Sequence, residues 1–386
     1  MCFTGFRLLL LTLGVGIAQC AVAAAQTSRE SADLFTAANV SVDATAETAA
    51  AARDVALGEG QRRALDIVLR RITLRADQTR LPRLEPAEVA ALTSGLQVKD
   101  EKTSTTRYLA RLTVNFKKDE IRELLRRSGI PFTETRAKPT LVLPVFERAG
   151  ALLMFDDENP WLDAWTTLGP RDDALLPLTL PLGDLADLAS IGPAQAVAGD
   201  ETRLNAIGQR YDVENVMVAH GKLTLDVAAG GRPRIDVDLR RYGPAGTGVV
   251  VESFAAEPEQ TLASLLAVAA QRIALRLEEE WKRETLLRFD TELVLSARLQ
   301  IAGLDDWIGM RDRLQRNAMI SRVELAALSR RDAQIVLHYL GQPSQLAVSL
   351  AQDDVELIDR DGYWELRLQG DARHEGRAAP AGQTGQ

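Results

Sequence analysis

Hydrophobic residues recur along the chain with two different periods, and the change of period predicts the order of helices and strands. Residues 31–136 open with a loosely alternating segment, Leu34–Val42, that is typical of a strand. The next segment, Ala46–Ile72, repeats its apolar residues at helical spacing. A short helix, two alternating strands and a helix that ends at Gly129 follow. This order predicts an N-terminal α+β domain.

Residues 138–289 combine continuous apolar runs with alternating segments. The continuous runs predict strands that are buried on both faces, at Thr140–Phe146, Leu175–Leu182 and Val213–Ala219. Two alternating strands and a long amphipathic helix follow them. Between the first two runs, Asn159 and Pro160 form a helix-start signal, and Trp161 and Trp165 lie four residues apart on one face. We therefore predict a central α/β domain with both tryptophans in its core.

Residues 290–370 follow the order strand, helix, strand, strand, helix and a final hairpin that turns at Asp361–Gly362. This order is the split βαβ pattern, so a C-terminal ferredoxin-like domain is expected. Residues 371–386 are polar and free of aromatic residues, which predicts a disordered tail. The fold class expected for the whole chain is multidomain α+β and α/β.

The first 25 residues have the pattern of a signal peptide. Arg7 precedes the apolar run Leu8–Ile17, and Ala23 and Ala25 satisfy the small-residue rule for cleavage before Gln26. An uncleaved inner-membrane anchor is the alternative. A lipid-modified Cys20 is disfavoured, because the preceding Gln19 is not small. Cleavage would place the mature protein in the periplasm and remove both cysteines, Cys2 and Cys20.

Charge and hydropathy restrict the partners of the mature chain. The 386 residues carry a formal net charge of −8, and no basic stretch is interleaved with aromatic residues. Nucleic acid is therefore excluded as the expected partner, because phosphate binding requires concentrated Lys and Arg. Beyond the leader, no segment approaches the length of a membrane span, so the mature chain is expected not to span a membrane.

No catalytic, cofactor or metal site is predicted. The three histidines, His220, His338 and His374, lack the spacing of a metal site or of an acid–base pair. Asp184 and Asp187 are the best candidates for carboxylate chemistry, because they follow a predicted strand end of the α/β domain. A glycine turn followed by a capping aspartate explains them more simply, and the surrounding segment contains no aromatic residue.

Several strings in the central part resemble one bacterial exported family, domain of unknown function 2066 (DUF2066). They are LVLPVF from Leu141, NPWLDAW from Asn159, PLGDLAD from Pro181 and IGQRYDVENVMVAHGKL from Ile207. GQRRAL from Gly60 and LLRRSGIP from Leu124 are similar to the N-terminal part of that family. The central domain also resembles, more loosely, the small α/β domains of periplasmic envelope proteins such as the N-terminal domain of the Tol-system propeller protein. The resemblance to DUF2066 implies no assigned activity, the resemblance to the envelope domains implies partner binding, and neither supplies catalytic residues.

The function expected from the sequence is that of a non-enzymatic periplasmic binding or scaffold protein whose partners are envelope proteins or cell-wall components. Two alternatives stay open. One is a periplasmic hydrolase that uses Asp184 and Asp187, and the other is a membrane-tethered envelope subunit.

Overall fold

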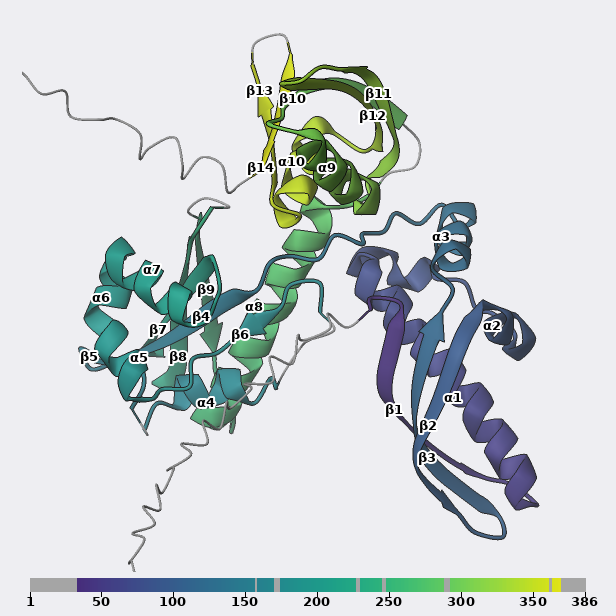
Figure 1. Ribbon diagram of the computed structural model, residues 1–386. Helices are drawn as coiled ribbons and strands as arrows, with labels where there is room; N and C mark the ends of the chain where they lie inside the picture. Colours follow the sequence, from purple (N-terminus) through teal and green to yellow (C-terminus); the bar gives the residue numbers. More distant parts are fainter. Residues whose placement is uncertain are drawn as a thin grey trace, which may run out of the picture.

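The computed structural model is a mixed α/β protein with three multi-stranded sheets and eleven helices in the part of the chain that it describes (Figure 1). The described residues are 33–156, 158–169, 174–226, 230–244, 248–287, 292–360 and 363–368. The predicted leader, the Asp361–Gly362 turn and the tail after residue 370 lie outside these ranges.

The first sheet is antiparallel, with the strand order β1-β3-β2. Its strands are β1 (Thr36–Thr45), β2 (Thr93–Thr103) and β3 (Arg107–Phe116). The helices that accompany it are α1 (Ala49–Ile72), the 3₁₀ helix η1 (Arg75–Arg80), α2 (Pro86–Leu92) and α3 (Lys118–Arg127). Thr48 caps α1 through its side chain, and the apolar stripe of α1 packs on β1 and β3. The elements predicted for this part of the chain are confirmed.

Two glycines of α1 give a matched stability prediction. A Cβ atom at Gly60 would lie 2.3 Å from Leu112 Cδ1 and 2.6 Å from Val42 Cγ1, two side chains that are buried in the sheet. A Cβ atom at Gly58 would meet nothing within 4 Å. We expect Gly58→Ala to stabilise the protein by about 0.5–1 kcal/mol, because alanine favours the helix. Gly60→Ala should instead destabilise it by about 1–3 kcal/mol through overpacking. Denaturant titrations measure both, and equal shifts of the two variants would contradict this packing.

The second sheet is mixed, with the order β5-β4-β7-β8-β9 and a short β6 beside β4. Its strands are β4 (Thr140–Arg148), β5 (Ala151–Leu153), β6 (Leu178–Thr179), β7 (Asn215–Asp226), β8 (Arg232–Tyr242) and β9 (Gly248–Ala255). Its helices are α4 (Pro160–Thr166), α5 (Leu185–Ser190), α6 (Pro193–Ala198), α7 (Glu201–Arg210) and α8 (Leu262–Glu284). Strands β4 and β7 are parallel, whereas β7, β8 and β9 are antiparallel.

The prediction of a buried strand over Leu175–Leu182 was wrong in length. Only Leu178 and Thr179 pair with β4, opposite Thr140 and Leu141. Pro177 and Pro181 flank this pair and lack the N–H that a central strand must donate. The apolar run therefore contributes only a two-residue strand to the sheet and leads into the turn at Gly183.

The predicted core role of the two tryptophans is confirmed. Asn159 accepts hydrogen bonds from the amides of Trp161 and Leu162, which fixes the start of α4. Trp161 and Trp165 are 0% and 2% exposed and meet edge to face, with ring centroids 5.7 Å apart. They pack with the apolar stripe of α8 against one face of the second sheet, and α6 and α7 cover the other face.

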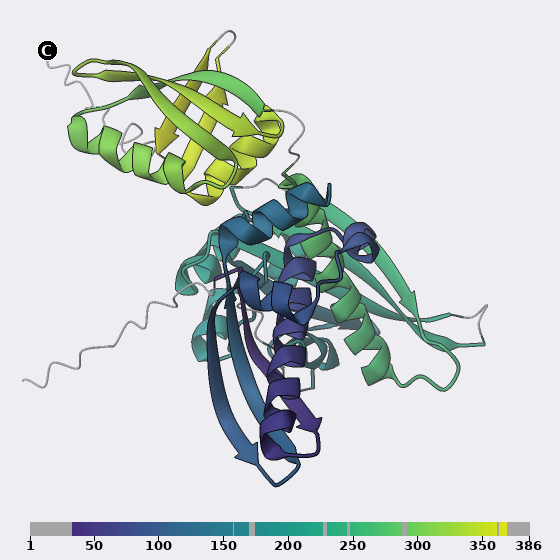
Figure 2. The ribbon, with the colours of Figure 1, turned by 90° about the vertical axis from the view of Figure 1, so that its right-hand side faces the viewer.

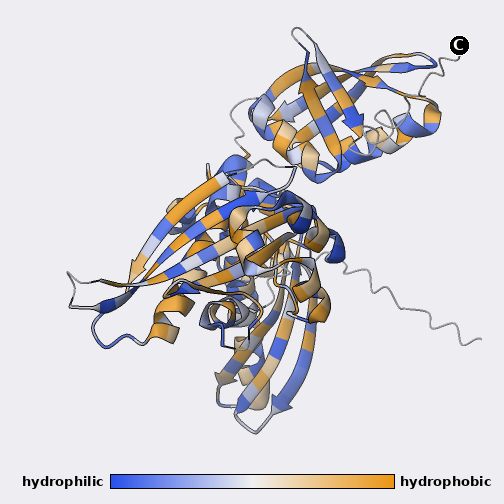
Figure 3. Ribbon diagram, turned by 90° about the vertical axis from the view of Figure 1, so that its left-hand side faces the viewer, coloured by the Kyte–Doolittle hydropathy of each residue, from blue (hydrophilic) through white to orange (hydrophobic). Residues whose placement is uncertain are grey.

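The third sheet has the order β11-β12-β10-β14-β13. Its elements are β10 (Glu292–Gln300), α9 (Leu304–Arg316), β11 (Ile320–Leu328), β12 (Asp332–Leu340), α10 (Pro343–Gln352), β13 (Val355–Asp359) and β14 (Trp364–Leu368). β12 lies between β10 and β11, as in a split βαβ unit. The strand after α10 does not pair with β10, because β14 inserts between them and runs parallel to β10. Figure 3 shows the alternation of hydrophobic and hydrophilic residues along these strands.

The parts of the chain are joined by buried contacts near the end of α8. Phe132 forms isolated bridges with both Thr73 and Leu287, and the buried apolar residues of the first and third sheets form one continuous cluster. Lys282, which is 6% exposed, donates hydrogen bonds to the carbonyls of Arg70 and Thr73 at the end of α1. The C-terminal ends of α1 and α8 therefore lie together (Figures 1 and 2).

Candidate functional site

Asp184 is a helix cap. It precedes α5, and its Oδ1 accepts hydrogen bonds of 3.0 Å from the amides of Ala186 and Asp187. Gly183, at φ +73°, forms the turn that brings Asp184 into this position. The predicted capping role of Asp184 is confirmed.

Asp187 is the centre of a buried polar cluster. Its side chain is 0% exposed and accepts hydrogen bonds from the Gly183 amide at 2.8 Å, Tyr211 Oη at 2.6 Å and Arg210 Nε at 2.7 Å. Arg210 also pairs with Asp184. Arg210 and Tyr211 were not predicted from the sequence, because they lie more than twenty residues away at the end of α7.

This cluster holds Asp187 as a carboxylate. Burial raises the pKa of Asp187, but hydrogen bonds from Tyr211, Arg210 and the Gly183 amide outweigh it, so that the pKa lies below its usual value. General-acid chemistry requires the opposite shift. Both oxygens of Asp187 are also occupied by protein donors. The arrangement anchors α5 to α7, and it does not present a reactive carboxyl pair.

Two histidines contact charged side chains on the sheets. His220 Nε2 lies 3.0 Å from Glu147 Oε2, and Lys222 Nζ lies 3.0 Å from Glu147 Oε1. Lys222 lowers the pKa of Glu147 against the opposing effect of burial. His338 contacts Arg322 at 3.1 Å, and His374 lies outside the described residues. The His220–Glu147 contact was not predicted from the sequence, because it joins two strands that are more than seventy residues apart.

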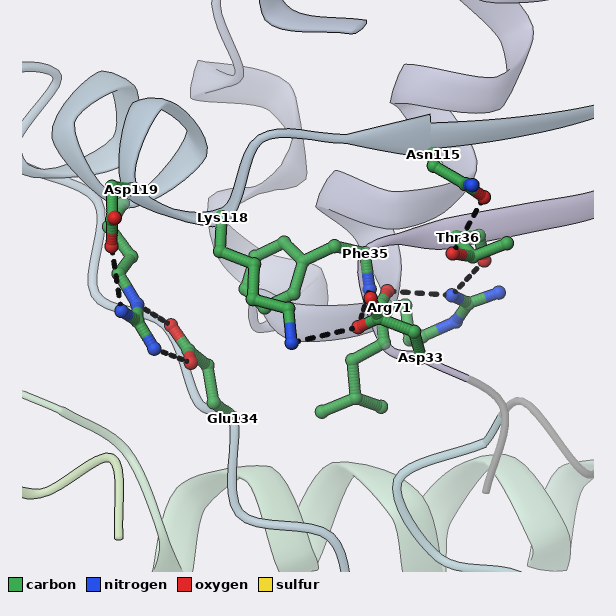
Figure 4. A network of polar contacts seen from close by, with 10 residues as sticks. Asp33, Phe35, Thr36, Arg71, Asn115, Lys118, Asp119 and Glu134 are labelled. Atoms are coloured by element: carbon green, nitrogen blue, oxygen red, sulfur yellow. Dashed lines mark hydrogen bonds and ion pairs between the residues drawn. The ribbon is translucent and has the colours of Figure 1, made fainter. Parts of the chain in front are cut away.

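A cleft of about 480 Å³ lies where the start of β1 and α3 approach α9 and α10. Figure 4 shows that the cations drawn at this cleft meet internal acceptors. Arg122 binds both oxygens of Glu134, at 2.7 and 2.6 Å, and Lys118 lies 3.5 Å from Asp33. Nearby, Arg71 donates to the carbonyls of Leu34 and Thr36. Lys118 and Arg71 hold the chain at the start of β1. Arg122 and Glu134 join α3 to the segment that follows the first sheet.

On the surface formed by α1, η1, α2 and α8, basic side chains outnumber acidic ones. A first hollow of about 740 Å³ lies beside the second half of α1. Five arginines line it, against one acidic residue, Asp66: Arg62, Arg63, Arg70, Arg75 and Arg83. Its remaining lining is largely apolar and includes Leu65, Leu81 and Leu84.

A second hollow of about 890 Å³ lies between α1 and α8. It shares Arg70, Arg75 and Gln78 with the first hollow, so the two are continuous. It adds five basic residues: Arg71, Arg272, Arg276, Lys282 and Arg283. Its acidic residues are Glu278 and Glu279. We call the two hollows together the arginine groove. Ten Lys and Arg residues line it, against three Asp and Glu.

Structural roles explain half of these cations. Arg70, Arg71, Lys282 and Arg283 lie in the last turns of α1 and α8, where positive charge stabilises the helix. Arg276 forms ion pairs with Glu252 and Glu280. The other five are exposed and have no ion-pair partner among the residues that the structure describes: Arg62, Arg63, Arg75, Arg83 and Arg272.

Two exposed aliphatic side chains, one from each helix, line the second hollow. Ile67 of α1 is 41% exposed, and Leu275 of α8 is 43% exposed. Each is flanked on its helix by arginines one turn away, Arg63 and Arg70 beside Ile67 and Arg272 beside Leu275. The arginine groove therefore combines unpaired positive charge with exposed apolar surface.

A scan of the chain against protein-family models finds no match, and neither does a search of the curated proteins. In the ranges that the structure describes, no helix has both the length and the apolar character that crossing a membrane requires.

Proposed function

We propose that the chain is an exported binding or scaffold protein of the bacterial cell envelope, and that the arginine groove is the surface that binds its partner. The partner carries negative charge. One observation supports this most strongly: a chain with a net charge of −8 places along one groove five arginines that form no ion pair with any residue the structure describes. Exposed arginines aligned in a groove attract anions over long range and bind carboxylate or phosphate groups through paired N–H donors.

Export to the periplasm is part of the proposal and rests on the leader pattern of residues 1–25. Membership of DUF2066 is also part of the proposal, and it rests on the sequence strings quoted above. We further propose that the chain is divided at 31–136, 138–289 and 290–370 into an α+β, an α/β and a ferredoxin-like domain. The element order supports this division, and β14 is then an additional strand in the third domain.

The two alternative functions, a hydrolase and a membrane-tethered subunit, are not equally supported. Hydrolysis by Asp184 and Asp187 is disfavoured, because Asp184 caps α5 and Asp187 is buried with a lowered pKa. A membrane-tethered subunit differs from the proposal only in whether residues 1–25 are cleaved, and it is compatible with the same groove. N-terminal sequencing of the protein from cell fractions separates the two, since cleavage leaves Gln26 first.

The binding proposal predicts that the purified protein is retained on heparin, a sulfated polyanion, at about 50 mM NaCl despite its negative net charge. The variant Arg62→Glu with Arg63→Glu should elute at clearly lower salt, because it reverses two unpaired charges in the groove. Arg330→Glu with Arg331→Glu makes the same change of charge in an exposed turn far along the chain and serves as the control. Flow-through of the wild type, or equal elution of both variants, would contradict the proposal.

A further inference from the structure

We propose that the ligand of the arginine groove is an acidic amphipathic helix of a protein partner. This inference rests on the proposed function and names its partner class. The helix would lie between α1 and α8, with carboxylates toward the unpaired arginines and apolar side chains between Ile67 and Leu275.

The spacing of the groove residues matches such a helix. On α1, Arg63, Ile67 and Arg70 follow each other at i, i+4 and i+7. On α8, Arg272, Leu275 and Glu279 follow at i, i+3 and i+7, with Arg276 beside Leu275. Each stripe is about 10 Å long, or two helical turns. The α1 stripe, with the order cation, aliphatic, cation, suits a helix that carries Glu or Asp on both sides of an apolar row. On α8, Arg272 and Leu275 continue this pattern, and Glu279 ends it.

The exposed side chains of Ile67 and Leu275, the apolar pair of the groove, favour this ligand over other anions. A polyphosphate would engage the arginines and leave Ile67 and Leu275 in water. A lipid bilayer presents its headgroups as a broad surface, whereas these arginines line two continuous hollows, one beside α1 and one between α1 and α8. An acidic amphipathic helix uses both features, and burial of the two aliphatic side chains adds a salt-independent contribution to binding.

The test is titration of the purified protein with a labelled peptide of Leu and Glu at amphipathic helical spacing, measured by fluorescence anisotropy at low and high NaCl. A peptide with Gln in place of Glu is the matched ligand control. Sodium polyphosphate and vesicles of phosphatidylglycerol are the competing probes. The protein variants are Arg62→Glu with Arg63→Glu, Leu275→Ser, and the control Arg330→Glu with Arg331→Glu.

We expect the acidic peptide to bind and the Gln peptide to bind at least about tenfold more weakly. The Arg62→Glu, Arg63→Glu variant should lose about tenfold in affinity, and the loss should shrink at high salt. Leu275→Ser should lose about three- to tenfold at every salt concentration, because it removes a packing contact. The control variant should stay within about twofold of wild type.

Three outcomes would overturn the inference. Binding of polyphosphate or vesicles without binding of the peptide would refute the helix and leave the proposed anion-binding function intact. Equal binding by Leu275→Ser and wild type would show that the apolar pair is not used. Failure of every anionic probe to bind would refute the proposed function itself.

Discussion

Replacing Trp165 with alanine is expected to lower the free energy of unfolding by about 3–5 kcal/mol, which is enough to unfold a marginal domain. Trp165 is 2% exposed and packs edge to face on Trp161 between α4 and α8. Alanine would leave a large cavity at this position, and the surrounding helices cannot close it without losing their contacts with the sheet. Thermal or denaturant unfolding measures the loss.

Phenylalanine variants sharpen this prediction. Trp161 Nε1 donates a hydrogen bond of 2.9 Å to the carbonyl of Ala219, whereas Trp165 Nε1 is buried and has no acceptor in the described part of the chain. Trp165→Phe removes a buried donor that has no acceptor, and Trp161→Phe removes a hydrogen bond. Trp165→Phe should therefore cost less than Trp161→Phe. The opposite order, or a Trp165→Ala protein of normal stability that has lost a partner, would show that α4 is an interface.

Asp187→Ala is expected to destabilise the protein by about 2–3 kcal/mol. The substitution leaves the Gly183 amide, Tyr211 Oη and Arg210 Nε without their shared acceptor. Breaking a buried charge pair costs about 3–5 kcal/mol, and the partial exposure of Arg210 reduces that figure through solvent screening. Asp184→Asn should cost little, because asparagine caps helices as well as aspartate does and the ion pair of Asp184 with Arg210 is partly exposed to solvent.

Acid titration tests the same cluster. The pKa of Asp187 is lower in the folded protein than its usual value, so the folded state favours the carboxylate. The stability that this carboxylate contributes is fully present above its unfolded pKa of about 4 and is lost as the pH falls through the folded value. Wild-type stability should therefore decline more steeply than that of Asp187→Ala below about pH 4. Parallel pH profiles would show that the cluster does not hold a carboxylate.

Local patterns predicted most helices and strands, because caps and periodicity are set by neighbouring residues. The Asn159–Pro160 start of α4 and the Gly129 end of α3 are examples. Leu175–Leu182 shows the limit of hydropathy, because the run is apolar but its prolines, Pro177 and Pro181, prevent a full strand.

Contacts between distant segments were not predictable from one sequence. Arg210 and Tyr211 join Asp187 only because α7 packs against α5. The arginine groove depends on the approach of α1 and α8, which are separated by about two hundred residues and meet through Lys282. The negative net charge of the whole chain concealed this local positive surface, because charge totals carry no information about position.

We propose that function resides in the arginine groove and not in the Asp184–Asp187 cluster. A growth competition tests it most directly, under a condition in which cells lacking the gene are outcompeted. Cells with Arg62→Glu and Arg63→Glu should compete like the deletion while the variant accumulates to wild-type level. Cells with Asp184→Asn, which keeps the helix cap, should compete like wild type. The reverse result, a harmless groove variant and a defective Asp184→Asn, would contradict the binding account and favour carboxylate chemistry.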